Sequence, residues 1–207
     1  DFDNVHQINT TDLETKTQTY NLNFKHDFDK EGHNLEMEAN FSITDAPEYA
    51  AFQELNNPND PILNYEDDIM NDRNNMTINI DYVNPLSESS KMELGLESRN
   101  LDMENARVTS QSQYIYDDNG NIIGTAPIED TKYEYNTDIY SAYATYTKEF
   151  EKLTMQLGGR LESYVAEAIY NNEKNFQDDY ITLYPSAFIT YKSTEKNQFQ
   201  LSFSRRV

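Results

Sequence analysis

The sequence predicts an all-β fold, an antiparallel up-and-down meander of about eight strands that is part of, or curled into, a β-barrel. Three observations predict it. Apolar and polar residues alternate with a period of two in one segment after another. The connections between these segments alternate strictly between short and longer ones. The chain carries 16 Tyr and 10 Phe but no Trp, an aromatic content that favours strands.

The alternation is clearest at residues 33–44, where apolar residues from Leu35 to Ile43 occupy every second position. Pro185 lies in the middle of another segment, which predicts an edge strand or a bulge there. The other strands are predicted at residues 16–28, 75–83, 91–101, 138–148, 153–165, 180–191 and from 198 to the end of the sequence. Because the last strand has no closing turn after it, we expect this chain to be a piece of a larger protein.

The connections are sorted by length and by charge. Short ones ("DFDKEGH", "NPLSESS", "EFEK" and "KSTEKN") alternate with longer ones at about 45–74, 102–137 and 166–179. In an up-and-down sheet all short turns then lie at one end, as in outer-membrane barrels with tight periplasmic turns and large extracellular loops. Residues 45–73 carry eight acidic side chains and one basic, and residues 102–138 carry eight acidic and two basic.

Composition excludes several classes of protein. A formal net charge of −21 would repel nucleic acid. No run of about 18 apolar residues is present, so a transmembrane helix is excluded. The absence of cysteine excludes disulfides and thiolate metal sites. No signal peptide opens the sequence, which fits a cytoplasmic protein or an excised piece.

Charged residues keep to the polar side of the predicted strands. This set comprises Glu36, Glu38, Lys91, Glu93, Glu97, Arg99, Arg160 and Glu162. A wet barrel lumen explains this parity, and so does the solvent-exposed face of a soluble sheet. The alternation of short and long connections favours the barrel.

Five stretches in order carry a family resemblance: "NLNFKHDFDKEGHNLEMEANFS", "IDYVNPLSESSKMELGLESR", "LGGRLESY", "YPSAFITYK" and "QLSFSRRV". Together they resemble the barrel of TonB-dependent receptors, in the outer membrane protein β-barrel family, over about residues 15–207. The resemblance implies one segment of a much larger outer-membrane barrel with short periplasmic turns and long acidic extracellular loops. Residues 1–14 would form an irregular N-terminal stretch before it.

The resemblance also implies the location, the function and the partners. The chain would lie in the cell outer membrane, in a receptor that imports an unknown nutrient ligand. Its partners would be membrane lipid, a plug domain, the remaining barrel strands and, through the parent chain, the energy-coupling TonB complex. Interfacial aromatic girdles are expected from Tyr20, Tyr82, Tyr146, Phe150, Tyr184 and Tyr191. The alternative is a soluble secreted β-domain for adhesion or ligand binding, which would bury the apolar face between two sheets.

No enzyme, cofactor or metal site is predicted. His26 and His33 flank a turn and fit polar strand ends better than metal ligands. "YDDNGNIIG" resembles the start of a calcium loop but lacks the closing acid, so we predict a hairpin that turns at Asn119-Gly120. "NYEDDIMNDRNN" reads as a solvated acidic loop. Gly158-Gly159 indicates a bend or a close approach within a strand rather than a phosphate cradle.

An eight-stranded slice would have two open edges and a bare apolar face. We therefore expect the isolated chain to curl into a smaller closed barrel or to pair with a copy of itself.

Overall fold

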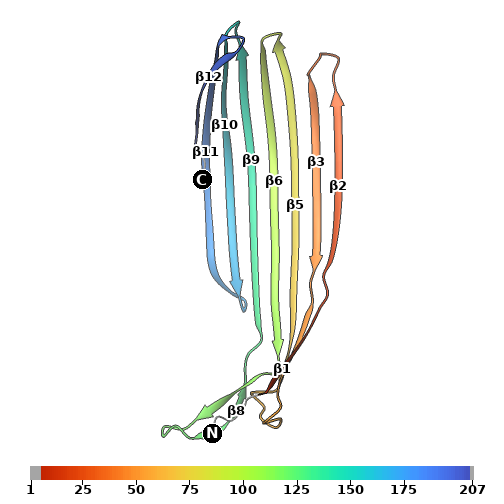
Figure 1. Ribbon diagram of the computed structural model, residues 1–207, viewed down its shortest axis with the longest axis vertical. Coiled ribbons are helices and arrows are strands. Elements are labelled where there is room, and N and C mark those ends of the chain that lie inside the picture. The colour runs from red at the N-terminus through yellow and green to blue at the C-terminus, as the bar shows by residue number, and fades with distance from the viewer. Residues whose placement is uncertain (1–5, 206–207) are drawn as a thin grey trace.

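The computed structural model describes residues 6–205 as one long sheet with a small hairpin at one end (Figure 1). Among these residues there is no helix long and apolar enough to cross a membrane. The strands are β1 (Gln7–Leu13), β2 (Lys16–Asp27), β3 (Asn34–Asp45), β4 (Glu48–Glu54), β5 (Tyr65–Ser87), β6 (Ser90–Thr109), β7 (Ser112–Tyr116), β8 (Ile122–Pro127), β9 (Thr131–Glu149), β10 (Leu153–Tyr170), β11 (Glu173–Thr194) and β12 (Asn197–Ser204).

The sheet is an antiparallel meander with eight strand positions across its width. β1 and β2 occupy one position and β3 and β4 the next, because β1 pairs with β4 where β2 pairs with β3. β5 pairs with β4 at its start and with β3 over the rest of its length. At the break, the Glu14 amide donates to the Pro47 carbonyl (3.2 Å) and the Ala46 amide donates to the Asn71 carbonyl (2.9 Å). The predicted all-β meander of about eight strands is therefore confirmed.

The sheet is open rather than closed. β2 and β12 lie on opposite sides of it, and within residues 6–205 neither is bonded to a strand on its outer side (Figure 1). The expectation that the chain curls into a smaller closed barrel is therefore wrong for this structure, whereas a segment of a larger barrel fits it. Pairing with a second copy stays a prediction.

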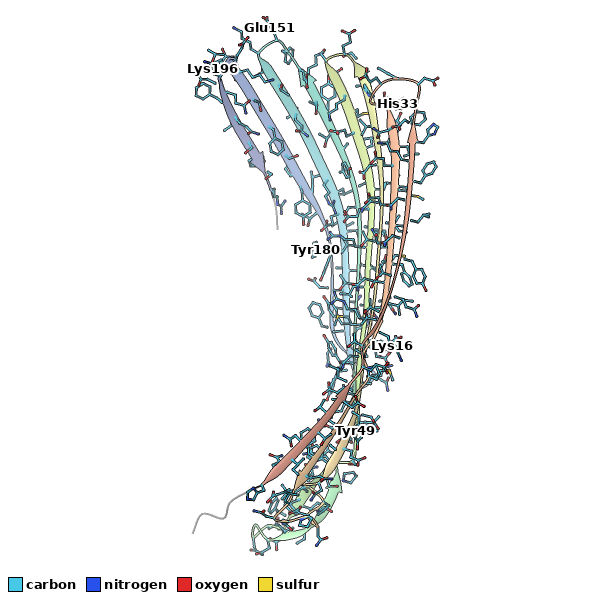
Figure 2. All side chains as sticks on the ribbon, turned by 45° about the vertical axis from the view of Figure 1, so that its right-hand side comes forward. Lys16, His33, Tyr49, Glu151, Tyr180 and Lys196 are labelled. Carbon is cyan, nitrogen blue, oxygen red and sulfur yellow. The ribbon has the colours of Figure 1, made fainter. Side chains whose placement is uncertain are left out.

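The two ends of the sheet differ as the sequence predicts. The short turns after β2, β5, β9 and β11 all lie at one end (Figure 1). The loop at residues 55–64 and the β7–β8 hairpin lie at the other end. Figure 2 shows Lys196, Glu151 and His33 together at the short-turn end, and the strands curving toward the opposite end.

The strands extend farther than the alternation predicts. Most of residues 45–74 is strand, so "NYEDDIMNDRNN" is not a loop but mainly the start of β5. Residues 166–179 are strand apart from a tight turn at Asn171 and Asn172, whose φ angles are 47° and 66°. The N-terminal stretch is not irregular throughout, because β1 lies within it; residues 1–5 lie outside the described part.

One face of the sheet carries an oblique apolar band. A row of directly opposed residues runs from Leu22 through Ala39, Ile78, Ser98, Tyr140 and Ser163 to Ile181. Leu22 is in the middle of the apolar stretch of β2. The apolar stretch of β11 runs from Ile181 to Tyr191, so Ile181 is its end farthest from the short turns. The band thus steps toward the short turns by about one residue per strand. With a rise of about 3.3 Å per residue and strands about 4.8 Å apart, this step equals a tilt of about 35°.

Pro185 marks a sheet edge, one of the outcomes predicted for it. It lies opposite Gly159 of β10 without a register shift. On the other side of β11, the pairing with β12 covers Ser186–Thr194, and the Arg205 amide donates to the Pro185 carbonyl (3.1 Å). On the N-terminal side of Pro185, the edge of β11 that faces away from β10 has no partner strand within the described residues.

Candidate functional site

The face opposite the apolar band carries the charged residues that the sequence assigns to the polar side of the strands. Glu38 is opposite Asn79, Asn79 is opposite Glu97, and Glu97 is opposite Ser141. Ser141 is opposite Glu162, which completes a row of polar side chains across five strands. We call this side of the sheet the polar face. The predicted parity of the eight charged residues is confirmed by these registers.

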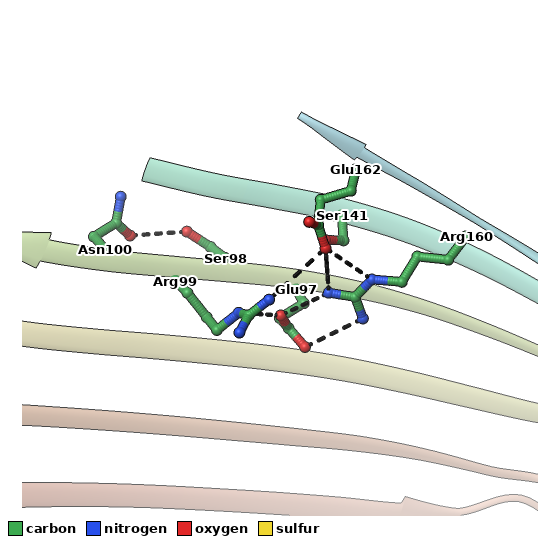
Figure 3. Close-up of polar contacts among 7 residues, drawn as sticks. All are labelled: Glu97, Ser98, Arg99, Asn100, Ser141, Arg160 and Glu162. Atoms are coloured by element: carbon green, nitrogen blue, oxygen red, sulfur yellow. Dashed lines mark hydrogen bonds and ion pairs between the residues drawn. The ribbon is translucent and has the colours of Figure 1, made fainter. Parts of the chain in front are cut away.

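Arg160 is the centre of an ionic network on the polar face (Figure 3). Its guanidinium binds both oxygens of Glu97, at 2.8 Å from Nη2 and 3.4 Å from Nη1. Nε donates to Glu162 Oε2 (3.2 Å), and Nη2 also donates to Ser141 Oγ (2.8 Å). Arg99 joins from β6, with Nε 2.6 Å from Glu97 and Nη2 3.7 Å from Glu162. We call Glu97, Arg99, Ser141, Arg160 and Glu162 the arginine network.

The arginine network is balanced in charge, with two guanidinium groups against two carboxylates. The side chains of Glu162 and Arg160 are 14% and 28% exposed, so water screens them only in part. A two-pronged arginine–carboxylate contact fixes both partners in orientation. The network therefore links β6, β9 and β10.

Next to the network, Tyr143 lies across Gly95. A Cβ atom added to Gly95 would lie 2.1 Å from the Tyr143 ring, so only glycine leaves room for it. The Tyr143 hydroxyl donates to Asp81 on β5, two strands away. The sequence analysis missed this contact; the signal was a glycine at a polar-parity position of an otherwise regular strand, where a close approach is expected.

The predicted close approach at Gly158-Gly159 holds for the first glycine. A Cβ on Gly158 would lie 2.8 Å from Ser186 Oγ, whereas one on Gly159 would be 3.8 Å from its nearest neighbour.

The predicted aromatic girdle needs one correction. Tyr20, Tyr82, Tyr146 and Tyr191 lie on the apolar face, since they are opposite Phe41, Leu94, Leu157 and Phe199. Phe150 lies in the turn after β9, where its ring is 5.9 Å from Lys148 Nζ. Tyr184, however, is opposite Arg160 and so belongs to the polar face. Tyr184 alternates with Leu183 and Pro185, which lie on the apolar side opposite Leu161 and Gly159, so its parity excludes it from the girdle.

The two histidines contact aromatic side chains. His33 Nε2 is 2.9 Å from the Tyr82 hydroxyl, and its ring stacks on Phe28 with centroids 4.0 Å apart. His26 meets Phe28 edge to face at 4.5 Å. In the part of the chain that the structure describes, no three metal-ligating side chains come together.

The hairpin predicted around Asn119-Gly120 is confirmed. β7 pairs with β8, and Gly120 has a φ of 82°. Asp117 Oδ1 accepts hydrogen bonds from the amides of Asn119 (2.9 Å) and Asn121 (2.8 Å). Hydrogen bonds from Asn121, first from its side chain and then from its backbone, hold the pKa of Asp117 below its usual value. The carboxylate therefore caps the hairpin turn.

A tyrosine ties this hairpin to the neighbouring loop. The Tyr114 hydroxyl donates to Asp60 in the loop at residues 55–64. This hydrogen bond to the carboxylate is the main cause that raises the pKa of Tyr114 to about 12. Turns are present at "NNPNDP" (residues 56–61), where the Asp60 carboxylate accepts a hydrogen bond from the Ile62 amide (3.0 Å).

An open, tilted sheet with an apolar band on one face and an ionic network on the other defines a segment of a transmembrane β-barrel wall. The chain belongs to the outer membrane protein beta-barrel family, whose model matches residues 26–207. Membership in this family places the chain in the outer membrane. No curated protein matches the sequence.

Solved structures share the fold, among them a siderophore receptor and a ferric citrate transporter. The siderophore receptor PiuA from Acinetobacter baumannii superposes with a TM-score of 0.58 at 15% identity, over 94% of this chain and 32% of the receptor. The ferric citrate transporter FecA in the unliganded form gives 0.53 at 14% identity, over 88% of this chain and 26% of the transporter. The chain thus spans about a third or less of each receptor, and the likeness concerns the fold.

Proposed function

We propose that this chain is part of the barrel wall of a TonB-dependent outer-membrane receptor that imports a bound nutrient ligand. The observation that carries the proposal is the division of the sheet into two faces. The apolar band is tilted by about 35°, within the range of outer-membrane strands, and the polar face opposite it carries the arginine network. Family membership and the fold shared with two outer-membrane receptors support it.

The two faces and the two edges receive different partners in this proposal. The apolar band meets membrane lipid, and the polar face meets the plug domain and the path of the ligand. The open edges at β2 and β12 pair with the remaining strands of the barrel, which satisfies their backbone groups. TonB acts through the parent chain. The polar face has no catalytic part in this account, because the charged side chains of the arginine network bind one another.

Neighbouring residues of β6 test which face meets lipid. The chain has no cysteine, so Leu96→Cys and Glu97→Cys each introduce a single thiol on opposite faces of one strand. In the complete receptor in bilayers, a lipid-soluble maleimide should label position 96. A water-soluble maleimide should label position 97, after urea extraction of the plug if the plug covers it. Labelling of position 96 by the water-soluble reagent alone would contradict the proposal.

Energy coupling is tested separately. Cross-linking in intact cells should yield an adduct of the complete receptor with TonB, and the adduct should disappear when TonB is deleted. If no adduct forms although the labelling pattern is as expected, the chain is an outer-membrane wall in a protein that TonB does not drive.

A soluble secreted β-domain would need a second sheet over the apolar face. Within residues 6–205 the only other sheet is the β7–β8 hairpin, which lies at the far end from the short turns (Figure 1). This arrangement does not favour the alternative.

A further inference from the structure

The polar face changes in character along β9, β10 and β11. In the middle of these strands it carries the charged pair Arg160 and Glu162, whereas toward the long loops four aromatic rings gather around Ala166 and Ala168. Tyr135 and Phe176 flank Ala168 in one row, and Tyr164 lies opposite Tyr180. We call the four rings of Tyr135, Tyr164, Phe176 and Tyr180 the aromatic plate. Tyr180 is labelled in Figure 2, about midway along the sheet.

The aromatic plate is packed against the sheet on one side and exposed on the other. The rings of Tyr164 and Tyr180 stack with centroids 4.8 Å apart and an angle of 20° between their planes. Ala166 and Ala168, which lie between the plate residues, are 0% and 6% exposed. In a single-layer sheet an alanine is buried only when neighbouring side chains cover it. Phe176 and Tyr180 nevertheless stay 47% and 37% exposed, so the plate offers preformed ring surface to the ligand path.

A free carboxylate accompanies the plate. Asp178 lies opposite Ala166 on the same face, is exposed, and makes no ion pair with any residue in the described range 6–205. It lies two residues from Tyr180 on the same strand and face, and diagonally across from Tyr164, which places it beside the stacked pair. The arginines of β6 do not neutralise it, because Arg99 binds Glu97 and Arg107 lies 3.9 Å from Asp67.

The electrostatic field around the aromatic plate is negative, like the charge of Asp178. Residues 45–73 and 102–138, which build the long-loop end, carry eight acidic side chains each against one and two basic ones. A mouth lined by one sign of charge concentrates ions of the opposite sign and repels ions of its own sign. A positive ligand would be drawn toward the plate, and an anionic ligand would be repelled.

We infer that the aromatic plate and Asp178 form a binding site for an organic cation on the ligand path. Aromatic faces attract ammonium and guanidinium groups, most strongly where water is partly excluded. The carboxylate of Asp178 supplies the counter-charge at the edge of the rings. This inference rests on the proposed function, since it requires the polar face to line the barrel interior, and it deepens that function by assigning a charge class to the nutrient.

The test uses the complete receptor in detergent and three end-blocked tetrapeptides, Lys-Arg-Lys-Arg, its all-Gln counterpart and its all-Glu counterpart. Calorimetry should detect binding of the cationic peptide only, with an affinity that falls as salt is raised. Tyr180→Leu should weaken this binding by about tenfold, which corresponds to about 1.4 kcal/mol. Tyr180→Phe keeps the ring and should bind as the parent does, whereas Asp178→Asn should weaken binding and flatten its salt dependence.

The matched control is Tyr140→Leu, because Tyr140 is a 53% exposed ring on the apolar face, opposite Ser98 and Ser163. It should leave peptide binding unchanged. Equal or tighter binding of the all-Glu peptide, or an unchanged affinity in Tyr180→Leu, overturns the inference. If the receptor is confirmed as a lipid-embedded wall by the cysteine labelling and the cationic peptide still fails to bind, the inference alone fails and the proposed function stands.

Discussion

The half of the sheet near the short turns and the half near the long loops are built from the same strands, yet they follow different rules. Near the short turns every second residue is apolar, as from Met76 to Tyr82 on β5. Toward the long loops both faces of the same strand are polar: Asp72 and Asn74 lie on the side of the apolar band, and Arg73 lies on the other. The comparison teaches that lipid imposes the alternation and that a strand continues without it where both faces meet water.

The largest difference in stability between the two halves is expected when a charge is placed on the apolar side of each half. Leu96→Arg lies within the apolar band, whereas Val108→Arg lies on the same side of β6 near the long loops. Arginine at the middle of a bilayer costs about 2–4 kcal/mol and near zero to 1 toward the interfaces. Denaturant unfolding of the receptor in bilayers should show this difference. Equal costs at the two positions would mean that the band is not a lipid-facing surface.

The arginine network gives the next largest contrast. Arg160→Ala leaves Glu97 and Glu162 without their main partner in a partly buried setting, and we expect a loss of about 2–3 kcal/mol. Lys174→Ala removes the ion pair with Glu167 near the long loops, where the two side chains are 48% and 31% exposed. That pair should contribute less than about 1 kcal/mol. The same unfolding measurement checks both, and similar losses would contradict the role of burial.

Two glycines differ in the room around them: Gly95 lies in the long sheet, and Gly124 lies in the β7–β8 hairpin at the long-loop end. Gly95→Ala would place a Cβ 2.1 Å from the Tyr143 ring, so the ring must move and its hydrogen bond to Asp81 is lost. Overpacking of this kind costs about 1–2 kcal/mol. Gly124→Ala in β8 meets nothing within 4 Å and should be neutral or slightly stabilising. A neutral result for Gly95→Ala would show that the tyrosine does not lie across the glycine in the membrane.

The smallest expected effect is local and depends on pH. The pKa of Asp117 lies below its ordinary value, so the ionised carboxylate stabilises the hairpin turn at neutral pH. That stabilisation is lost as the pH falls through the depressed pKa, below the ordinary aspartate pKa of 3.8. The protection of the Asn121 amide against hydrogen exchange, relative to its intrinsic rate at the same pH, should fall in that range. In Asp117→Asn this fall should be absent, and an equal pH response in both proteins would contradict the capping role.

The sequence predicts the part of the fold in which one face is apolar. β2, β3 and β12 match their predicted segments closely, because residues such as Leu22, Met37 and Leu201 mark one face without ambiguity. β4 and the outer parts of β5, β6 and β9 were assigned to loops, because alternation gives no signal where both faces are wet. The hairpin of β7 and β8 was nevertheless predicted, since Asn119-Gly120 marks its turn directly.

The candidate site was predictable in its membership but not in its geometry. Parity places Glu97, Arg160 and Glu162 on one face, yet only the register brings Arg160 onto Glu97 two strands away. The aromatic plate escaped the sequence analysis because Tyr135 and Phe176 lie in stretches predicted as connections, and only the register brings them beside Ala168. The assignment of Tyr184 to the girdle was wrong because Tyr184 has the opposite parity to Ile181 and Leu183 on the same strand.

The central claim is that the apolar band meets lipid, and sedimentation of the 207-residue chain with and without a mild detergent tests it most directly. We predict a monodisperse species in micelles and aggregation or self-association in plain buffer, because the described sheet has no second layer over the band. A compact monomer in plain buffer would contradict the claim, since the band would then be buried inside the protein.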